Sequence, residues 1–350
     1  MSKVSFALVG AGGIAQRYAQ AFQGHPSAEL VAVADTRPAA AAALAEPFGC
    51  PHFAGYEDVL THGPPPDAVL ICTPPNTHEP LTAAFARRGV HVLCEKPFTL
   101  TAASARRMAA LADQCGVLLT MASKFRFVAD VAAAKRLIDG GAVGEVVLWE
   151  NAFTGRVDMA KRWNSDPAVS GGGVLIDNGT HSVDLMRYFL GPLAEVTCVE
   201  GKRIQGLAVE DTVRLFVRST AGVMGTVDLS WSLNKELDWF VTVYGTAGTL
   251  QVGWKQSRLK RAGGDWEKFG DGYDKVVAFT AQLANFAAAI RGDGPLAVTP
   301  ADAIASVDVV EAAYRSLRHP AWTGVPDRDP ADLFQTPPPS TFRADVVARV

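Results

Sequence analysis

The sequence predicts an α/β chain with two domains, a parallel sheet covered by helices followed by an α+β domain with a mostly antiparallel sheet. Its 350 residues are about twice the length of a typical single domain. Up to about residue 123, short apolar runs alternate with helical segments, and beyond it longer strands dominate. We therefore expect domains at residues 1–123 and 124–350.

The elements of the first domain are short and regular. Its predicted strands are continuous apolar runs without the polar alternation of a half-exposed sheet: 4–9, 30–34, 68–72, 90–94 and 117–121. Between these strands lie segments of helical composition: 14–23, 39–48, 79–88 and 101–115. Strands that alternate with helices indicate βαβ units, and hence a parallel sheet with helices on both faces.

The second domain begins with a helix over 128–139, which two glycines terminate. Its predicted strands follow: 145–152, 195–200, 211–217, 225–231 and 239–244. Several alternate, as Val227, Leu229 and Trp231 do with polar neighbours, so that one sheet face is apolar. Two helices, 276–290 and 300–316, precede a proline-rich tail whose order the sequence leaves open.

Composition excludes several classes of function. A net charge of −3, from 33 basic and 36 acidic residues, offers no footprint for nucleic acid or an anionic membrane. No window contains the roughly 20 apolar residues of a membrane helix, and residues 1–10 do not resemble a secretory signal, so we expect a cytoplasmic protein. The five cysteines are scattered, which predicts small core residues and no disulfide framework or paired metal motif.

A glycine motif, G-x-G-x-x-A, directly follows the first strand. Gly10 permits the tight turn, Gly12 lets the backbone approach a pyrophosphate, and Ala15 lets the next helix pack closely on the strand. The N–H groups that open this helix, around Gly13 and Ile14, face the phosphates. Because the motif joins a strand to a helix, it predicts a dinucleotide site and not an ordinary glycine-rich turn.

Asp35 ends the second strand, about 20 residues after the glycines, where a carboxylate can accept hydrogen bonds from the adenosine ribose. It would repel a 2′-phosphate, which favours NAD over NADP. Arg37 lies two residues further and offers a phosphate partner, so NADP stays open. The alternative for Arg37 is a solvated surface charge.

A stiff polar loop follows the strand that ends at residue 72, at the edge where open α/β sheets bind ligands. It contains Thr73, Pro74, Asn76 and His78, which we expect to contact the cofactor. The alternative for His78 is a helix-capping or surface histidine.

Glu95 and Lys96 end the next strand, again at the carboxyl edge. A lysine beside the nicotinamide can donate to the substrate oxygen and handle the proton released with the hydride. Glu95 is its expected charge partner, and the following proline stiffens the turn. The alternative is an ordinary exposed lysine at a strand end.

A third group of residues follows three glycines, Gly171–Gly173. A helix from these glycines to Leu190 places Asp177, His181 and Asp184 on one polar face. The imidazole can act as acid or base, oriented by a carboxylate four residues away. The alternative is a structural histidine held by an aspartate. Metal binding by Asp177 and His181 is disfavoured because no third ligand is evident.

The order of these motifs resembles the Gfo/Idh/MocA family, which includes glucose–fructose oxidoreductase and inositol dehydrogenases. The resemblance covers nearly the whole chain, including 279–314. It implies a Rossmann domain, a second domain with an open sheet, a homodimer or homotetramer formed through that sheet, and a nicotinamide cofactor between the domains. Lys96 matches the lysine of the family's E-K-P motif, and Asp177 and His181 match its D-x-x-x-H pair, which implies catalytic or substrate-contacting roles.

The resemblance extends to further candidate contacts. Arg126, Trp163 and Asn164 fall where family members often contact substrate or cofactor. Their alternatives are an interdomain ion pair and packing. Pro75 stands where many relatives carry asparagine, which weakens the inferred contacts of Asn76 and His78. The chain also shows no leader of the kind seen in periplasmic members, in keeping with the expected cytoplasmic location.

The predicted function is NAD-dependent oxidation of a hydroxyl carbon on a sugar, inositol or related polyol. Lys96 and His181 handle the hydroxyl proton, and Asp177 fixes His181 or a substrate hydroxyl. One alternative uses bound NAD transiently, for glycoside cleavage or elimination. Another is a non-catalytic dinucleotide-binding regulator, which would be free to lose Lys96 or His181.

Overall fold

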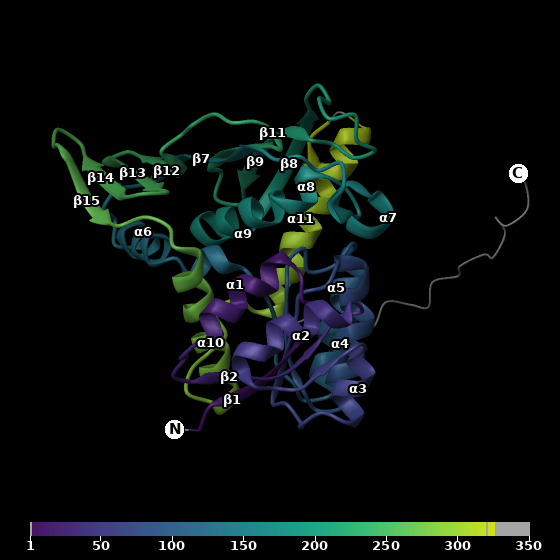
Figure 1. Cartoon of the computed structure of the whole chain (residues 1–350). Coiled ribbons are helices and arrows are strands. Elements are labelled where there is room, and N and C mark those ends of the chain that lie inside the picture. The colour runs from purple at the N-terminus through teal and green to yellow at the C-terminus, as the bar shows by residue number, and fades with distance from the viewer. Residues whose placement is uncertain (1, 320, 326–350) are drawn as a thin grey trace, which may run out of the picture.

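The computed structural model describes residues 2–319 and 321–325 (Figure 1). The proline-rich tail beyond residue 325 lies outside the described residues. None of the helices in the described ranges is long and apolar enough to cross a membrane.

A six-stranded parallel sheet forms the N-terminal part, in the order β3-β2-β1-β4-β5-β6. The predicted strands are confirmed as β1 (Val4–Val9), β2 (Ala28–Ala34), β4 (Ala68–Ile71), β5 (His91–Cys94) and β6 (Leu119–Met121). So are the helices α1 (Gly13–Phe22), α2 (Pro38–Ala45), α4 (His78–Ala86) and α5 (Ala102–Gln114). The prediction missed β3 (His52–Phe53) and α3 (Tyr56–Thr61). These elements are too short to show a hydrophobic period.

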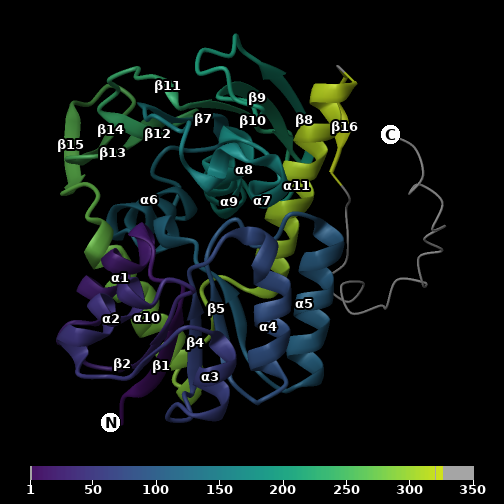
Figure 2. The same ribbon diagram turned by 45° about the vertical axis from the view of Figure 1, so that its right-hand side comes forward.

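Both faces of this sheet are buried, as the continuous apolar strands predict (Figures 1 and 2). Phe6 and Leu8 of β1 share a core with α1 and α2, whereas Ala7 and Val9 share another with α4 and α5. The strand order reverses around β1, whose neighbours β2 and β4 lie on opposite sides. Ligands of open α/β sheets bind at the carboxyl ends of the strands beside such a reversal.

The second part contains a larger sheet, in the order β15-β14-β13-β12-β7-β10-β9-β8-β16. The predicted strands are confirmed as β7 (Val146–Arg156), β8 (Leu193–Glu200), β9 (Thr212–Ser219), β10 (Met224–Ser230) and β12 (Trp239–Gly245). Not predicted were β11 (Ser232–Leu233), β13 (Gly248–Gly253), β14 (Ser257–Arg261), β15 (Trp266–Gly270) and β16 (Thr323–Gly324). The neighbouring strands pair antiparallel, except β10 with β7. The sheet is thus mostly antiparallel, as expected.

Helices cover one face of this sheet, as both views show (Figures 1 and 2). They are α6 (Ala129–Asp139), α8 (Val174–Asp177), α9 (Gly179–Leu190) and α11 (Pro300–Arg318). Val227 and Leu229 of β10 enter this core, whereas Met224 on the same strand remains 54% exposed on the other face. The second face is therefore open.

The continuous helix expected up to Leu190 is wrong in one detail. Asn178 separates α8 from α9. Here the His181 N–H bonds to the Asn178 carbonyl three residues back, and the Thr180 hydroxyl donates to the Ile176 carbonyl. The junction is therefore wound more tightly than an α-helix.

Two C-terminal helices return to the N-terminal part. α10 (Lys275–Arg291) contacts α1, and its Phe279 stacks on Tyr18. α11 contacts α5 and β6 at one end and β8 and α9 further along, so it joins both parts (Figure 2). The division at residue 123 remains a proposal about the chain, and in space both helices cross it.

Candidate active site

Two adjoining cavities occupy the carboxyl edge of the first sheet. One, of about 910 Å³, is lined by Asp35 and Arg37, and the other, of about 700 Å³, by Lys96 and Asp177. They share five lining residues and form one groove: Gly12, Gly13, Cys72, Thr73 and Trp163. The predicted cofactor residues therefore lead into the predicted reacting residues.

The glycine turn fits a dinucleotide. Gly10 has φ +96°, and a Cβ there would lie 2.8 Å from the Cys72 carbonyl carbon, so only glycine is accommodated. A Cβ on Gly12 or Gly13 would meet nothing within 4 Å and would instead project into open space at the start of α1. Ile14 lines the second cavity, and Ala15 is fully buried. The bare backbone at the helix N-terminus can therefore approach a pyrophosphate.

Asp35 is held rigidly at the cavity wall. Its carboxylate accepts the Ala11 N–H at 2.7 Å, the Arg37 N–H at 2.8 Å and the Arg37 Nε–H at 3.0 Å. Burial raises the pKa of Asp35, but the hydrogen bonds from Arg37 and Ala11 outweigh burial and hold it below its ordinary value. Asp35 is therefore ionised, and Arg37 is engaged by it instead of standing free for a 2′-phosphate.

The polar loop after β4 divides into two groups. Thr73 and Pro74 line the first cavity, as expected. His78 is fully buried: its Nε2 lies 2.9 Å from the Thr73 carbonyl oxygen and its Nδ1 3.1 Å from that of Phe98. Asn76 is exposed, and neither it nor His78 is among the residues that line the groove. The structure thus places His78 as the internal brace of the loop and not as a cofactor contact.

Lys96 reaches across to the second part of the chain. Its Nζ lies 2.6 Å from Asp177 Oδ1 and 3.2 Å from the Asp177 carbonyl oxygen. These side chains are 16% and 18% exposed, so the ion pair borders the cavity while remaining largely shielded. The fold therefore brings together two residues 81 positions apart that the sequence analysis selected independently.

Glu95 is not the charge partner of Lys96, contrary to expectation. Its carboxylate accepts a hydrogen bond from the Tyr18 hydroxyl at 2.9 Å and from the Lys96 backbone N–H at 3.0 Å. Burial raises the pKa of Glu95, although the positive charges of Lys96 and Lys124 oppose the rise. Glu95 therefore fixes the backbone at Lys96 while Asp177 holds the side chain.

His181 has an unexpected partner. Its Nε2 lies 2.9 Å from Lys124 Nζ, and its Nδ1 is buried without a hydrogen-bond partner among the described residues. The expected orientation of His181 by an aspartate is wrong. Asp177, four residues before it, pairs with Lys96, and Asp184, three residues after it, pairs with Arg126. Burial, together with the charges of nearby lysines, holds the pKa of His181 well below its usual range. Its imidazole is therefore neutral near pH 7.

Lys124 is a site residue to which the sequence analysis assigned no role. It lies in a short 3₁₀ helix, η3 (Lys124–Phe127), and lines the second cavity in front of His181. Burial and the charge of Lys96 lower its pKa to about 7. The available signal was its position three residues after β6, at the same carboxyl edge as Lys96.

Stability should consequently depend on pH through Lys124. Its pKa is lower in the folded chain than in the unfolded chain, so above pH 7 the unfolded state binds more protons and stability rises with pH. Between pH 7 and 9 we expect the unfolding free energy of the wild type to increase by about 1 to 2 kcal/mol relative to Lys124→Met. Urea unfolding at several pH values measures this, and parallel curves for the two proteins would contradict it.

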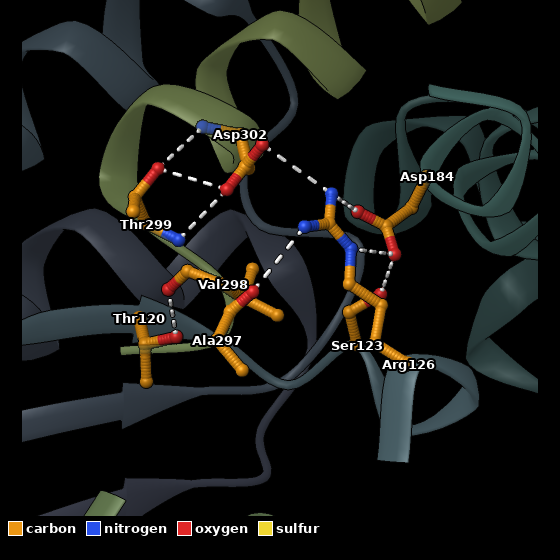
Figure 3. A network of polar contacts seen from close by, with 8 residues as sticks. All are labelled: Thr120, Ser123, Arg126, Asp184, Ala297, Val298, Thr299 and Asp302. Atoms are coloured by element: carbon orange, nitrogen blue, oxygen red, sulfur yellow. Dashed lines mark hydrogen bonds and ion pairs between the residues drawn. The ribbon is translucent and has the colours of Figure 1, made fainter. Parts of the chain in front are cut away.

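Arg126 forms an ion pair, as the alternative expected, but its acidic partners lie in the same predicted domain, 124–350 (Figure 3). Its guanidinium donates to Asp184 at 2.6 and 2.9 Å and to the Ala297 carbonyl oxygen at 3.3 Å, and it lies 3.4 Å from Asp302. Ser123 also donates to Asp184. Arg126 is not among the groove-lining residues, so it joins η3, α9 and the start of α11 instead of contacting a ligand.

The remaining predicted residues lie at the groove. Trp163 lines both cavities and is 41% exposed, and Asn164 lines the second. The three glycines before α8 serve packing: a Cβ on Gly173 would lie 1.9 Å from the Glu210 carbonyl oxygen. Glu210 in turn accepts hydrogen bonds from the Gly173 and Leu175 N–H groups. This anchors α8 and thereby Asp177.

The described residues contain no cluster of three or more His, Cys, Asp or Glu side chains placed to hold a metal ion. The five cysteines are free. Cys94 and Cys198 are buried in the core, whereas Cys72 lines the groove.

Three features of the groove define a two-domain nicotinamide-dependent oxidoreductase. They are the glycine turn Gly10–Ala15, Asp35 at the end of β2, and Lys96, which faces the second part of the chain. Residues 4–123 match the model of the oxidoreductase family with an NAD-binding Rossmann fold, and residues 131–251 match the GFO/IDH/MocA C-terminal domain. The chain belongs to the Gfo/Idh/MocA family and is an NAD-binding oxidoreductase.

Relatives match over nearly their whole length. The rhizopine catabolism protein MocA of Rhizobium meliloti is 32% identical over 321 residues, covering 91% of this chain and 96% of that protein. Inositol 2-dehydrogenase of Rhizobium meliloti (strain 1021) is 29% identical over 334 residues, covering 90% and 97%. The crystal structure of aldose-aldose oxidoreductase from Caulobacter crescentus superimposes with a TM-score of 0.84 at 25% identity, covering 92% and 99%.

Proposed function

We propose that this protein oxidises a hydroxyl carbon of a sugar, inositol or related polyol and transfers the hydride to NAD. The observation that carries this is the Lys96–Asp177 pair at 2.6 Å, in a cavity continuous with the glycine cradle. Relatives named inositol 2-dehydrogenase and D-apiose dehydrogenase support the substrate class.

The cofactor would be held along the first sheet edge. The turn Gly10–Ala15 would receive the pyrophosphate, Asp35 the adenosine ribose, and Thr73 with Pro74 the adjoining wall. When bound, the nicotinamide ring accepts the hydride. Trp163 and Asn164 would then contact the substrate from the second domain.

Lys96 and His181 have different roles at the substrate hydroxyl. Lys96 donates a hydrogen bond to the substrate oxygen and stabilises the negative charge that grows on it as the hydride leaves, while Asp177 orients Nζ. The neutral imidazole of His181 accepts the hydroxyl proton at Nε2. His181 does not itself line the cavity, because Lys124 lies in front of it and donates to that nitrogen in the free enzyme, so Lys124 must turn away first.

A substrate screen tests the proposal. Sugars, inositols and sugar acids are offered with NAD or NADP, and the absorbance of the reduced cofactor is followed. Reduced cofactor released in step with product supports a net oxidation. Product formed without free reduced cofactor would instead support transient redox in cleavage or elimination.

Cofactor preference should respond to Asp35. In Asp35→Ser, the repulsion of a 2′-phosphate is gone and Arg37 is released to pair with it, so KM for NADP should fall by about 10-fold or more. Steady-state kinetics with both cofactors measures this. Adding Arg37→Met should cancel the gain, and a strong NADP preference in the wild type would refute the role of Asp35.

Assembly and location complete the proposal. The open face of the second sheet, on which Met224 is 54% exposed, would pair with a second copy to form a homodimer or homotetramer. Sedimentation velocity tests this, since a monomer would contradict it. A cytoplasmic location remains part of the proposal, and cell fractionation tests it.

A further inference from the structure

The substrate half of the groove has a marked excess of positive charge. Its cavity of about 700 Å³ is lined by six basic side chains and two acidic ones. The basic residues are Arg17, Lys96, Lys124, Lys161, Arg162 and Lys275.

The two carboxylates offset only part of this excess of positive charge. Asp177 is paired with Lys96 at 2.6 Å, and Glu95 is buried and accepts hydrogen bonds from Tyr18 and the Lys96 backbone. Within residues 2–319 and 321–325, no carboxylate lies within ion-pair distance of the other five basic side chains. The cavity therefore keeps a net positive charge that its two carboxylates do not balance.

Two of these lysines, Lys124 and Lys275, lie near the reacting residues. Burial and the charge of Lys96 lower the pKa of Lys124, and burial with the charges of Arg17 and Lys96 lowers the pKa of Lys275. Both ammonium groups also act on His181. Crowded cations cost stability unless an anion joins them.

The phosphates of the cofactor would balance only part of the excess positive charge in this cavity. Its phosphates would lie at the start of α1, over Gly12 and Gly13, and Arg17 follows one turn later on that helix. Lys124 comes from η3 and contacts His181. It therefore faces the reacting end of the groove, where the substrate and not the pyrophosphate would lie.

We propose that the substrate is an anionic sugar or polyol, whose carboxylate or phosphate group binds between Lys124 and Lys275. This inference rests on the proposed function. An oxyanion only accepts hydrogen bonds and ammonium groups only donate them, so the two are complementary. A neutral polyol gains no such ion pair, because its hydroxyl groups carry no charge. Binding of the anion also draws Lys124 from His181 and frees Nε2 for the hydroxyl proton.

Matched substrates test the inference with the full-length protein and NAD. Each set contains a neutral sugar, its uronate and its phosphate, such as glucose, glucuronate and glucose 6-phosphate. We expect kcat/KM of one anionic member to exceed that of the neutral one by about 10-fold to 100-fold, the value of one charge-assisted pair. The member that is preferred identifies the group as a carboxylate or a phosphate.

Lys275→Met is the decisive variant, because Lys275 is an exposed residue at the start of α10. In this variant the ratio of kcat/KM for the anionic member to kcat/KM for the neutral member should fall by about tenfold, the value of one charge-assisted pair. Lys202→Met, at an exposed lysine outside the groove, should retain the full preference. KM of the anionic substrate should also rise with salt, and that of the neutral one should not.

The outcomes separate the two proposals. Oxidation of neutral members as efficiently as anionic ones would overturn the anionic site and leave the proposed oxidation standing. An anionic preference that is undiminished in Lys275→Met would overturn the placement of the site. If no sugar, acid or phosphate were oxidised, the proposed function would fail and the inference with it.

Discussion

Lys96→Met should lower kcat on the sugar or polyol substrate by about 10³-fold, within the range of general acid–base catalysis, and leave NAD binding within about twofold. The ammonium group is the charged donor that Asp177 positions at 2.6 Å. Methionine has a similar length but no charge or donor, so the negative charge growing on the substrate oxygen loses its partner. Turnover is measured with saturating substrate, and cofactor binding by calorimetry.

Two controls make this result specific. Lys202→Met removes an exposed lysine outside the groove and should turn over like the wild type. Lys96→Met also leaves Asp177 unpaired, so Lys96→Met combined with Asp177→Asn should restore any lost thermal stability but not the turnover. A Lys96→Met enzyme that kept more than about a tenth of wild-type kcat would refute the assigned role.

Asp184→Asn should lower the free energy of unfolding by about 3 kcal/mol, the cost of removing one partner from a buried ion pair. The Asp184 side chain is 0% exposed and accepts two hydrogen bonds from Arg126, which is 6% exposed (Figure 3). Asparagine keeps the shape but removes the charge, and leaves the guanidinium with Asp302 at 3.4 Å. Urea unfolding measures the loss.

A surface ion pair provides the matched control. Arg214 pairs with Asp228 on the open sheet face and is 53% exposed, so Arg214→Met should change stability by less than about 1 kcal/mol. An Asp184→Asn loss as small as this would show that the Arg126 network does not hold η3, α9 and the start of α11 together. The network also matters to the site, because α9 carries both Asp184 and His181, and η3 carries both Arg126 and Lys124.

The elements around the cofactor site were predictable from local pattern. Continuous apolar runs identified β1, β4 and β5, since a strand buried on both faces has no polar alternation. The turn at Gly10 was predictable because glycine alone adopts its φ of +96° beside the Cys72 carbonyl. The late strands β14 and β15 were missed, because charged residues interrupt their hydrophobic pattern.

The side-chain partners of the site residues could not be predicted from the sequence. Sequence alone selected Lys96, Asp177 and His181, but paired Lys96 with Glu95 and His181 with an aspartate. In the structure Lys96 reaches Asp177, and His181 meets Lys124 across 57 positions. Arg126 and His78 were both expected to contact a ligand, but Arg126 pairs with Asp184 and His78 contacts the Thr73 carbonyl oxygen.

The sequence by itself determined the dinucleotide cradle, the class of both domains and most of the reacting residues, because these depend on backbone conformation and on the period of burial along one element. Only the tertiary structure decided which charges meet. Hydrogen bonds and ion pairs between separate elements, such as those between η3 and α9, form where packing brings their side chains within about 3 Å. Periodicity shows that a face is buried but does not show which residues lie against it. The positive excess around Lys124 and Lys275 arises in the same way, from lysines on separate elements that meet in one cavity.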